Sequence, residues 1–281
     1  MTQLAIHWNI HPEIFPLNDG IELRWYGFFF FLFLIFGYSY LRQALKKESK
    51  PIAIADEVFI YMALCIFIGA RLAYVFIYKL DYFKDHLLEI PMFWKGGMTG
   101  HGAYIAVAIG TITYTYFRKE ISLGWLADKL VIPIFFAGFC IRLGNFFNHE
   151  IVGIPTSQFW GVFFKYYNSG QFPIPRIPIQ LIEGIGYLVI MLFLLFILPK
   201  KYQEKEGNRM AWALIFLFSW RLFVDLFKED MVFTSFAGIT LPFSYWLSFP
   251  FIIAGIFILS KSFFTKHKTI IKANNYEKLY Q

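Results

Sequence analysis

The amino-acid sequence predicts an all-α integral membrane protein with seven transmembrane helices. Three observations support this fold class: an apolar composition, long apolar segments, and basic residues concentrated in alternate loops. Hydrophobic residues make up 58% of the 281 residues and charged residues only 16%, and the mean hydropathy is +0.52. Because soluble domains carry about 25% charged residues, we expect lipid to surround most of the chain.

Seven apolar segments are long enough to cross a bilayer, since a transmembrane helix needs about 17 to 25 residues. The third and fourth segments are less uniformly apolar because His101 and Arg142 lie in them. The predicted spans are residues 23–41, 55–77, 100–117, 128–147, 178–198, 209–227 and 242–260. We expect these spans to form a single membrane domain, residues 1–264, followed by a basic cytoplasmic tail, residues 265–281.

The Lys and Arg residues between the spans predict the orientation of the chain. Alternate loops are rich in them: segments 42–50, 118–129, 200–209 and 261–281 carry 4, 3, 4 and 5. The other loops are poor in them: segments 1–20, 78–99, 149–177 and 228–241 carry 0, 3, 2 and 1. Basic loops stay in the cytoplasm, so the N-terminus is predicted outside and the C-terminus inside. The net charge of +7 then faces anionic lipid, and no nucleic-acid partner is expected.

Two segments on the predicted outer side are too long to be tight turns. Residues 1–20 contain Trp8 and two prolines, which indicates an arm lying at the membrane interface, where tryptophan is common. Residues 149–177 contain three prolines and several aromatic residues, which indicates a small extracytoplasmic lobe.

The sequence offers little support for a metal or another cofactor. Cys65 and Cys140 both lie within apolar segments, so a small hydrophobic role fits them better than a disulfide or a metal site. His149 and Glu150 are adjacent, but no further metal ligand follows at a standard spacing. A Gly-Lys-Ser/Thr phosphate loop and a Gly-x-Ser-x-Gly elbow are also absent from the sequence.

Basic side chains gather at one predicted depth of the membrane. Four arginines lie in or at the edge of spans, all toward the external half: Arg24, Arg71, Arg142 and Arg221. Tyr26 and His101 are predicted at the same level. Charge inside a membrane is costly and usually lines a functional cavity, so the cluster predicts an anion site. The alternative is snorkelling and ion pairing, for example between Arg221 and Asp225 at helical spacing.

Residues 141–153 are the most informative segment, with the sequence Ile-Arg-Leu-Gly-Asn-Phe-Phe-Asn-His-Glu-Ile-Val-Gly. This segment resembles the signature of the prolipoprotein diacylglyceryl transferase family, Gly-Arg-x-Gly-Asn-Phe-x-Asn-x-Glu-x-x-Gly. Only the first fixed position departs, where Ile141 replaces glycine. Further segments are similar to family segments: Arg24–Gly27, Gly69–Val75, Trp94–Gly102, Asp128 with Pro133, and Leu247–Pro250 with Gly255.

Two other family segments are matched less well. The family's His-Pro-(Ser/Thr)-Gln-Leu-Tyr-Glu segment resembles residues 177–183, where Ile177 and Ile182 stand in place of histidine and tyrosine. A late segment of tyrosine, arginine and glutamate resembles Leu217, Arg221 and Asp225, so the tyrosine is lost and the acid is shorter.

The resemblance implies an enzyme of the bacterial cytoplasmic membrane with its site toward the external half. It would move a diacylglyceryl group from phosphatidylglycerol to the lipobox cysteine of prolipoprotein signal peptides, forming a thioether and releasing glycerol phosphate. Arg142 and Arg221 would bind the lipid phosphate, because a guanidinium can bind phosphate with two parallel hydrogen bonds.

The resemblance also assigns the remaining site residues. His101 is the candidate base toward the thiol, or alternatively a histidine that organises its glycine-rich turn. Tyr26 would hold the headgroup through its hydroxyl, or alternatively belong to an interfacial aromatic belt. The predicted headgroup pocket is completed by Asn145, Glu150 and Gly153.

Two other functions remain open at this point. One is a diverged, non-catalytic protein that binds or transports phospholipid or another anion. Transporters often contain repeated halves and broken helices, and the sequence shows no repeat. The other is a transferase that uses the same phospholipid with a different acceptor. The membrane lipid is a partner in each case.

Overall fold

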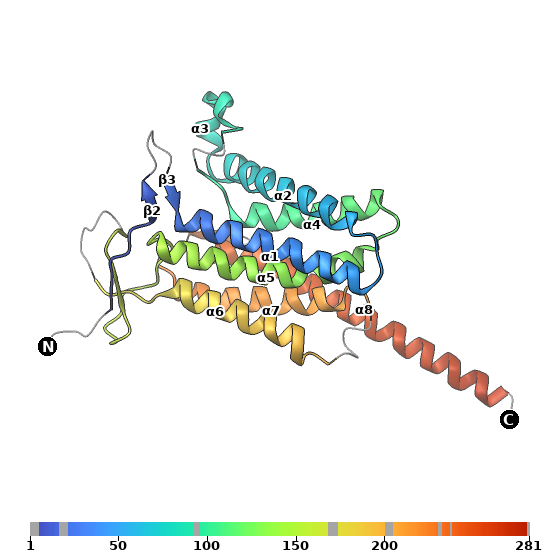
Figure 1. Cartoon of the computed structure of the whole chain (residues 1–281). Coiled ribbons are helices and arrows are strands. Elements are labelled where there is room, and N and C mark those ends of the chain that lie inside the picture. Colours follow the sequence, from blue (N-terminus) through green and yellow to red (C-terminus); the bar gives the residue numbers. More distant parts are fainter. Residues whose placement is uncertain are drawn as a thin grey trace. The chain divides into compact units, whose positions relative to one another are not determined.

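A computed structural model describes residues 6–16, 22–92, 96–167, 174–199, 205–229, 232–236 and 238–279, without the side chains of Pro16, Glu22, His101 and 262–279. Most of this chain is helical, which confirms the predicted class of helical membrane protein (Figure 1). Two compact units are distinguished, one formed by residues 37–130 and one by the residues on either side, up to 36 and from 131. Each unit is described separately.

Each of the seven predicted spans coincides with a long helix. These helices are α1 (Trp25–Lys47), α2 (Ala53–Ala73), α4 (Gly100–Phe117), α5 (Leu123–Phe147), α6 (Ile179–Leu192), α7 (Asn208–Asp225) and α8 (Phe243–Leu279). A π-helical turn extends α2 over Tyr74–Tyr78, and another extends α6 over Phe193–Ile197. Two short helices follow α2: α3 (Leu80–Asp85) and η3 (Leu87–Glu89).

Five helices of the described chain are long and apolar enough to cross a membrane. They are α1, α2 with its extension, α5, α6 with its extension, and α8. Helix α4 opens on Gly100 and His101, and α7 carries Arg209, Arg221 and Asp225, which make these two helices more polar. A crossing by α4 and α7 therefore stays a prediction.

Within the described residues, six short strands form three two-stranded sheets that the all-α prediction did not include. The strands are β1 (Ile6–Trp8), β2 (Glu13–Pro16), β3 (Glu22–Arg24), β4 (Val162–Phe164), β5 (Phe233–Phe236) and β6 (Ile239–Pro242). β1 pairs in parallel with β4, whereas β2 with β3 and β5 with β6 form antiparallel pairs. Strands of three or four residues are too short to show a clear two-residue hydrophobic period.

The pairing of β1 with β4 joins the predicted arm to the predicted lobe. Phe146, at the end of α5, forms a small core with Val152 and with Val162 and Phe164 of β4. The Trp8 ring of β1 covers this core and lies 4.4 Å from the Phe146 ring. Residues 1–5 and 17–20 of the arm and 168–173 of the lobe lie outside the described chain.

Close helix packing positions the end of α5 in this unit. The backbone of Gly184 in α6 lies against α5, so that a Cβ there would be 3.2 Å from Cβ of Arg142. α7 packs along both α6 and α8. The backbone of α8 continues as a helix to Leu279, through most of the segment predicted as a tail.

The unit of residues 37–130 is organised by contacts between α2 and α4. Gly69 and Gly102 lie where the two helices approach most closely, and a Cβ on Gly69 would be 2.1 Å from Cβ of Ala106. Thr99 caps the start of α4, because its hydroxyl accepts a hydrogen bond from the Gly102 amide at 3.3 Å.

Candidate functional site

The signature segment ends α5 in a tight backbone turn. The Glu150 amide donates to the Asn145 carbonyl at 3.0 Å, and the His149 amide donates to the Phe146 carbonyl at 3.2 Å. These two bonds, with His149 in the left-handed region at φ 55°, make a Schellman motif. The turn folds Glu150 back over the last turn of the helix.

His149 fills a position that usually holds glycine. Its side chain is buried, and its Nε2 atom lies 2.8 Å from the Ile10 carbonyl oxygen. Burial, with a smaller effect from the charge of His11, lowers the pKa of His149, and the Ile10 hydrogen bond only partly opposes this. The histidine therefore holds the arm against the signature in its neutral form.

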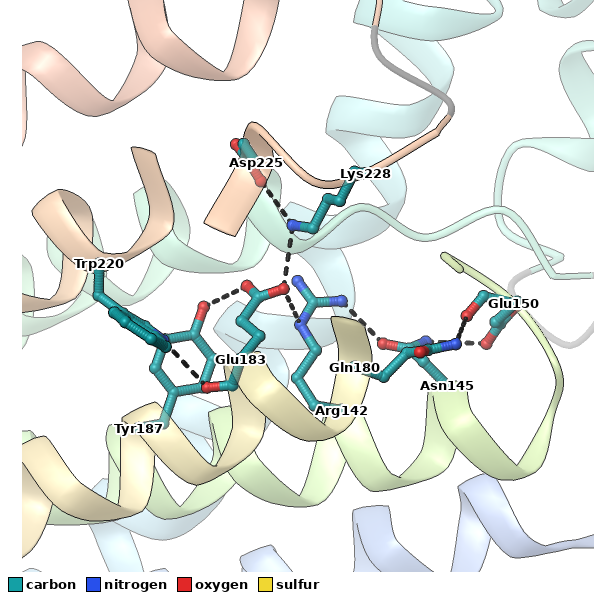
Figure 2. Close-up of polar contacts among 9 residues, drawn as sticks. All are labelled: Arg142, Asn145, Glu150, Gln180, Glu183, Tyr187, Trp220, Asp225 and Lys228. Carbon is teal, nitrogen blue, oxygen red and sulfur yellow. Dashed lines mark hydrogen bonds and ion pairs between the residues drawn. The ribbon is translucent and has the colours of Figure 1, made fainter. Parts of the chain in front are cut away.

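A continuous chain of polar contacts runs from this turn into α6 (Figure 2). Asn145 donates through Nδ2 to the Glu150 carboxylate at 2.8 Å and accepts at Oδ1 from Nη1 of Arg142 at 2.9 Å. The Nε atom of Arg142 lies 2.8 Å from Oε2 of Glu183. In addition, Nε2 of Gln180 donates to the Glu150 carbonyl at 2.8 Å. Arg142, Asn145, Gln180 and Glu183 are buried, whereas Glu150 is exposed.

Glu183 is the centre of this network. Its side chain is completely buried, and its Oε2 atom is shared by Arg142 and by Nζ of Lys228 at 3.0 Å. Its Oε1 atom accepts a 2.5 Å hydrogen bond from the hydroxyl of Tyr187, one turn further along α6. Lys228 also contacts the buried Asp225 at 2.5 Å. Figure 2 shows these side chains converging from α5, α6 and the end of α7.

The pKa of Lys228 reflects the other positive charges near it. Burial lowers the pKa of the Lys228 ammonium, and the charges of Arg142 and Arg221 lower it further, against the attraction of Glu183 and Asp225. Three basic side chains thus lie close to two carboxylates. This surplus of positive charge suits the binding of an anion.

Tyr26 and Gly153 also lie at the end of α5. Gly144 lets Tyr26 of α1 approach the helix, because a Cβ at this position would lie 2.6 Å from Cδ2 of the tyrosine ring. Gly153 lies between Ile177 and Phe227: its amide donates to the Ile177 carbonyl at 3.0 Å, and a Cβ would be 2.6 Å from that oxygen. The structure therefore brings Tyr26, Arg142, Asn145, Glu150 and Gly153 to one end of α5.

His101 belongs to the other unit. Its backbone lies in the first turn of α4, which Thr99 caps, and its side chain lies outside the described part of the structure. The role of His101 as a base stays a prediction.

The remaining arginines of the predicted cluster differ in their surroundings. The guanidinium of Arg71 is buried and donates to four backbone carbonyls, those of Glu89, Ile90, Gly96 and Gly97. Arg24 is half exposed and lies 3.9 Å from Glu13. These contacts support a structural role for both residues.

Four residues of the network were not assigned a role from the sequence: Gln180, Glu183, Tyr187 and Lys228. One signal was present, because a glutamate within the apolar segment 178–198 is costly unless it is paired. Their convergence depends on packing between separate helices, which no local spacing reveals. The alternative considered for Arg221, an ion pair with Asp225, did not include Lys228, whose Nζ atom lies 2.5 Å from Oδ1 of Asp225.

Among the described residues no group of three or more His, Cys, Asp or Glu side chains has the arrangement needed to hold a metal ion. The fold and the site together define a helical membrane protein in which buried arginine and lysine side chains cluster around buried carboxylates.

Comparison with known proteins identifies the family. The family model described as prolipoprotein diacylglyceryl transferase matches residues 12–261. The chain therefore belongs to the prolipoprotein diacylglyceryl transferase family.

Several relatives match over nearly their whole length. The phosphatidylglycerol–prolipoprotein diacylglyceryl transferase of Chloroherpeton thalassium is 34% identical over 264 residues, which cover 93% of this chain and 96% of the relative. The protein of the same name from Chlamydia trachomatis is 35% identical over 268 residues, covering 90% and 97%. That from Tolumonas auensis is 32% identical over 254 residues, covering 90% and 96%.

Proposed function

We propose that this protein transfers the diacylglyceryl group of phosphatidylglycerol to the lipobox cysteine of prolipoproteins. The observation that carries this proposal is the match to the family over residues 12–261, which includes the whole signature. The names of the relatives supply the lipid donor and the protein acceptor. The buried cations at the end of α5 supply a chemical reason for it.

The reaction replaces a carbon–oxygen bond by a carbon–sulfur bond. The cysteine sulfur attacks the terminal glyceryl carbon, the bond from this carbon to the phosphate oxygen breaks, and glycerol phosphate leaves. The phosphate group passes from a diester with one negative charge to a monoester that can carry two. Positioned cations that stabilise charge as it develops are often the largest catalytic contribution. Arg142 and Arg221 would serve in this way.

The other site residues would complete the headgroup pocket. The side-chain amide of Asn145 contacts both Arg142 and Glu150 and so fixes their positions relative to each other. The exposed Glu150 and the hydroxyl of Tyr26 would bind the glycerol end of the lipid, and Gly153 would shape the pocket. His101 would accept the thiol proton, since thiolate is the effective nucleophile and free cysteine has a pKa of about 8.5.

The proposed topology has seven spans, with α4 and α7 added to the five that are apolar enough by themselves. The basic loops place the C-terminus in the cytoplasm of a bacterium, with the arm, the lobe and the site toward the external half of the inner membrane. Prolipoprotein signal peptides would reach the site from within the membrane.

The test combines purified protein with phosphatidylglycerol and a synthetic lipobox peptide, and follows the peptide mass and the release of glycerol phosphate. We expect a diacylglyceryl mass gain that falls at least about a hundredfold in Arg142→Ala, since an interaction with a charged group is lost from a buried site. Arg118→Ala is the matched control, because Arg118 is a half-exposed arginine that pairs with Glu57.

Each outcome has a clear meaning. A mass gain that Arg142→Ala abolishes and Arg118→Ala retains supports both the reaction and the site. No mass gain, with phosphatidylglycerol still bound in an Arg142-dependent way, would contradict the proposed reaction and favour a lipid-binding protein.

A further inference from the structure

We propose, on the basis of the proposed transferase function, that Tyr187 is a positioning residue of this reaction. Its hydroxyl orients the carboxylate of Glu183, and through that carboxylate it fixes Arg142 and Lys228 for the phosphate group of the lipid. Neither the family signature nor the other segments of resemblance include Tyr187.

The geometry joins Tyr187 to the cations through one carboxylate. The phenol donates to Oε1 of Glu183 at 2.5 Å, whereas Oε2 lies 2.8 Å from Nε of Arg142 and 3.0 Å from Nζ of Lys228. The two carboxylate oxygens therefore have different partners. Tyr187 and Glu183 are only 1% and 0% exposed, so water does not replace either partner.

A glutamate carboxylate needs such a partner if it is to hold two cations in place. The last torsion of the glutamate side chain is broad and roughly two-fold, and it has no sharp minimum of its own. A hydrogen bond to one oxygen fixes this torsion and thereby the direction of the other oxygen. The phenol of Tyr187 supplies that bond, because it lies four residues after Glu183 on the same face of α6.

The packing of α5 against α6 is shaped to admit the tyrosine ring. A Cβ on Gly138 would lie 2.8 Å from Cδ2 and 3.1 Å from Cε2 of Tyr187. The space for the ring thus exists because position 138 carries no side chain. The ring also lies near Phe135, with centroids 6.3 Å apart.

Two departures from the family pattern concern tyrosines. At Ile182 and Leu217, two tyrosines of the resembled segments are replaced by aliphatic side chains. Leu217 is buried in this structure, and Ile182 is exposed. The phenol found in the buried network is that of Tyr187, one turn beyond Glu183 along α6.

The first experiment compares Tyr187→Phe with Tyr114→Phe. Tyr114 is a matched control, because its hydroxyl also donates to a glutamate, Glu57, that pairs with an arginine. For Tyr187→Phe we expect kcat with phosphatidylglycerol to fall about ten- to a hundredfold, as for loss of a hydrogen bond to a charged group. The KM for the lipobox peptide should change less than about twofold, because the cations act on the lipid. Tyr114→Phe should leave both constants unchanged.

A second measurement separates positioning from a general structural role. If Tyr187 acts through Glu183, its hydroxyl should matter much less when the carboxylate is an amide. In a double-mutant cycle, Tyr187→Phe should therefore reduce kcat only a few-fold in the Glu183→Gln background. Equal fold-losses in both backgrounds would overturn the inference.

The outcomes distinguish this inference from the function on which it rests. A wild-type protein that transfers the diacylglyceryl group, with Tyr187→Phe equally active, would overturn the role of Tyr187 and leave the transferase function standing. A wild-type protein that does not transfer the group would overturn both.

Discussion

Two of the described clusters of tyrosine, glutamate and arginine use the same chemistry in different surroundings. In the first, Glu183 accepts from Tyr187 at 2.5 Å and lies 2.8 Å from Arg142. In the second, Glu57 accepts from Tyr114 at 3.0 Å and from Arg118 at 2.6 Å. The glutamate side chain is 0% exposed in the first cluster and 39% exposed in the second.

The difference in burial decides what each cluster does. Water screens the exposed pair, and such pairs contribute about 0 to 1 kcal/mol to folding. A buried carboxylate must be paired, and removing one partner leaves an uncompensated charge that costs about 3 to 5 kcal/mol. The buried cluster therefore holds charged groups in fixed positions, which is what a catalytic site requires, whereas the exposed cluster adds a modest link between α2 and α4.

The largest expected effect is a difference in stability between variants of the two glutamates. Glu183→Gln leaves Arg142 and Lys228 without their shared counter-charge, so we expect the free energy of unfolding to fall by about 3 to 5 kcal/mol. Glu57→Gln should lower it by less than about 1 kcal/mol. Unfolding of both variants in the same detergent provides the measurement. Equal losses in the two variants would show that burial does not distinguish the clusters.

A smaller effect concerns a buried group that has no counter-charge. His149 has a pKa below its usual value because burial disfavours the imidazolium, so the unfolded or detached state binds the proton more readily. Protonation therefore favours release of the arm. The contribution of neutral His149 to the free energy of the β1–β4 pairing should be present above about pH 6.5. Up to about 1.4 kcal/mol of it should be lost at pH 5.5.

Hydrogen exchange of the Ile6–Trp8 amides at pH 7.5 and pH 5.5, corrected for the intrinsic rate, measures this effect. His149→Gln is the control, because a glutamine does not titrate while His7 and His11 of the arm remain. The same pH response in the control would assign the effect to those two histidines instead.

The smallest expected effect is the salt dependence of the interaction energy in the two glutamate–arginine pairs. At 1 M ionic strength the Debye length is about 3 Å, so exposed charges are largely screened while buried ones are not. A double-mutant cycle on Glu57 and Arg118 should give a coupling of about 0.5 kcal/mol at low salt and close to zero at 1 M. The coupling between Glu183 and Arg142 should keep most of its value. A coupling of Glu183 with Arg142 that salt also removes would mean that water reaches this pair.

The sequence predicted the helices better than the rest of the fold. Long apolar segments placed all seven helices near their observed positions, because one physical property, hydrophobic length, determines them. The strands were missed because they contain only three or four residues each and, for β1 and β4, because the two pairing strands lie far apart in the chain. The β1 strand near residue 7, for example, pairs with β4 more than 150 positions later.

The site residues that lie close together in the sequence were predicted, and those contributed by distant segments were missed. Arg142, Asn145 and Glu150 lie within nine residues, and the structure links them by hydrogen bonds. Glu183 joins them only because α6 packs against α5, and Lys228 joins them because the segment after α7 pairs with Gly153. A sequence gives the spacing of residues within one segment. Which faces of separate segments turn toward the same carboxylate depends on side-chain packing between them.

The turn at the end of α5 has a consequence for the length of the signature. The amide of Glu150 donates a hydrogen bond to the carbonyl of Asn145 across four intervening residues. The distance between these two side chains is therefore set by a backbone turn with a fixed number of residues. A single inserted or deleted residue would turn Glu150 away from Asn145, whatever its chemical identity. The number of residues between Asn145 and Glu150 therefore matters to the motif as much as the functional groups that it carries.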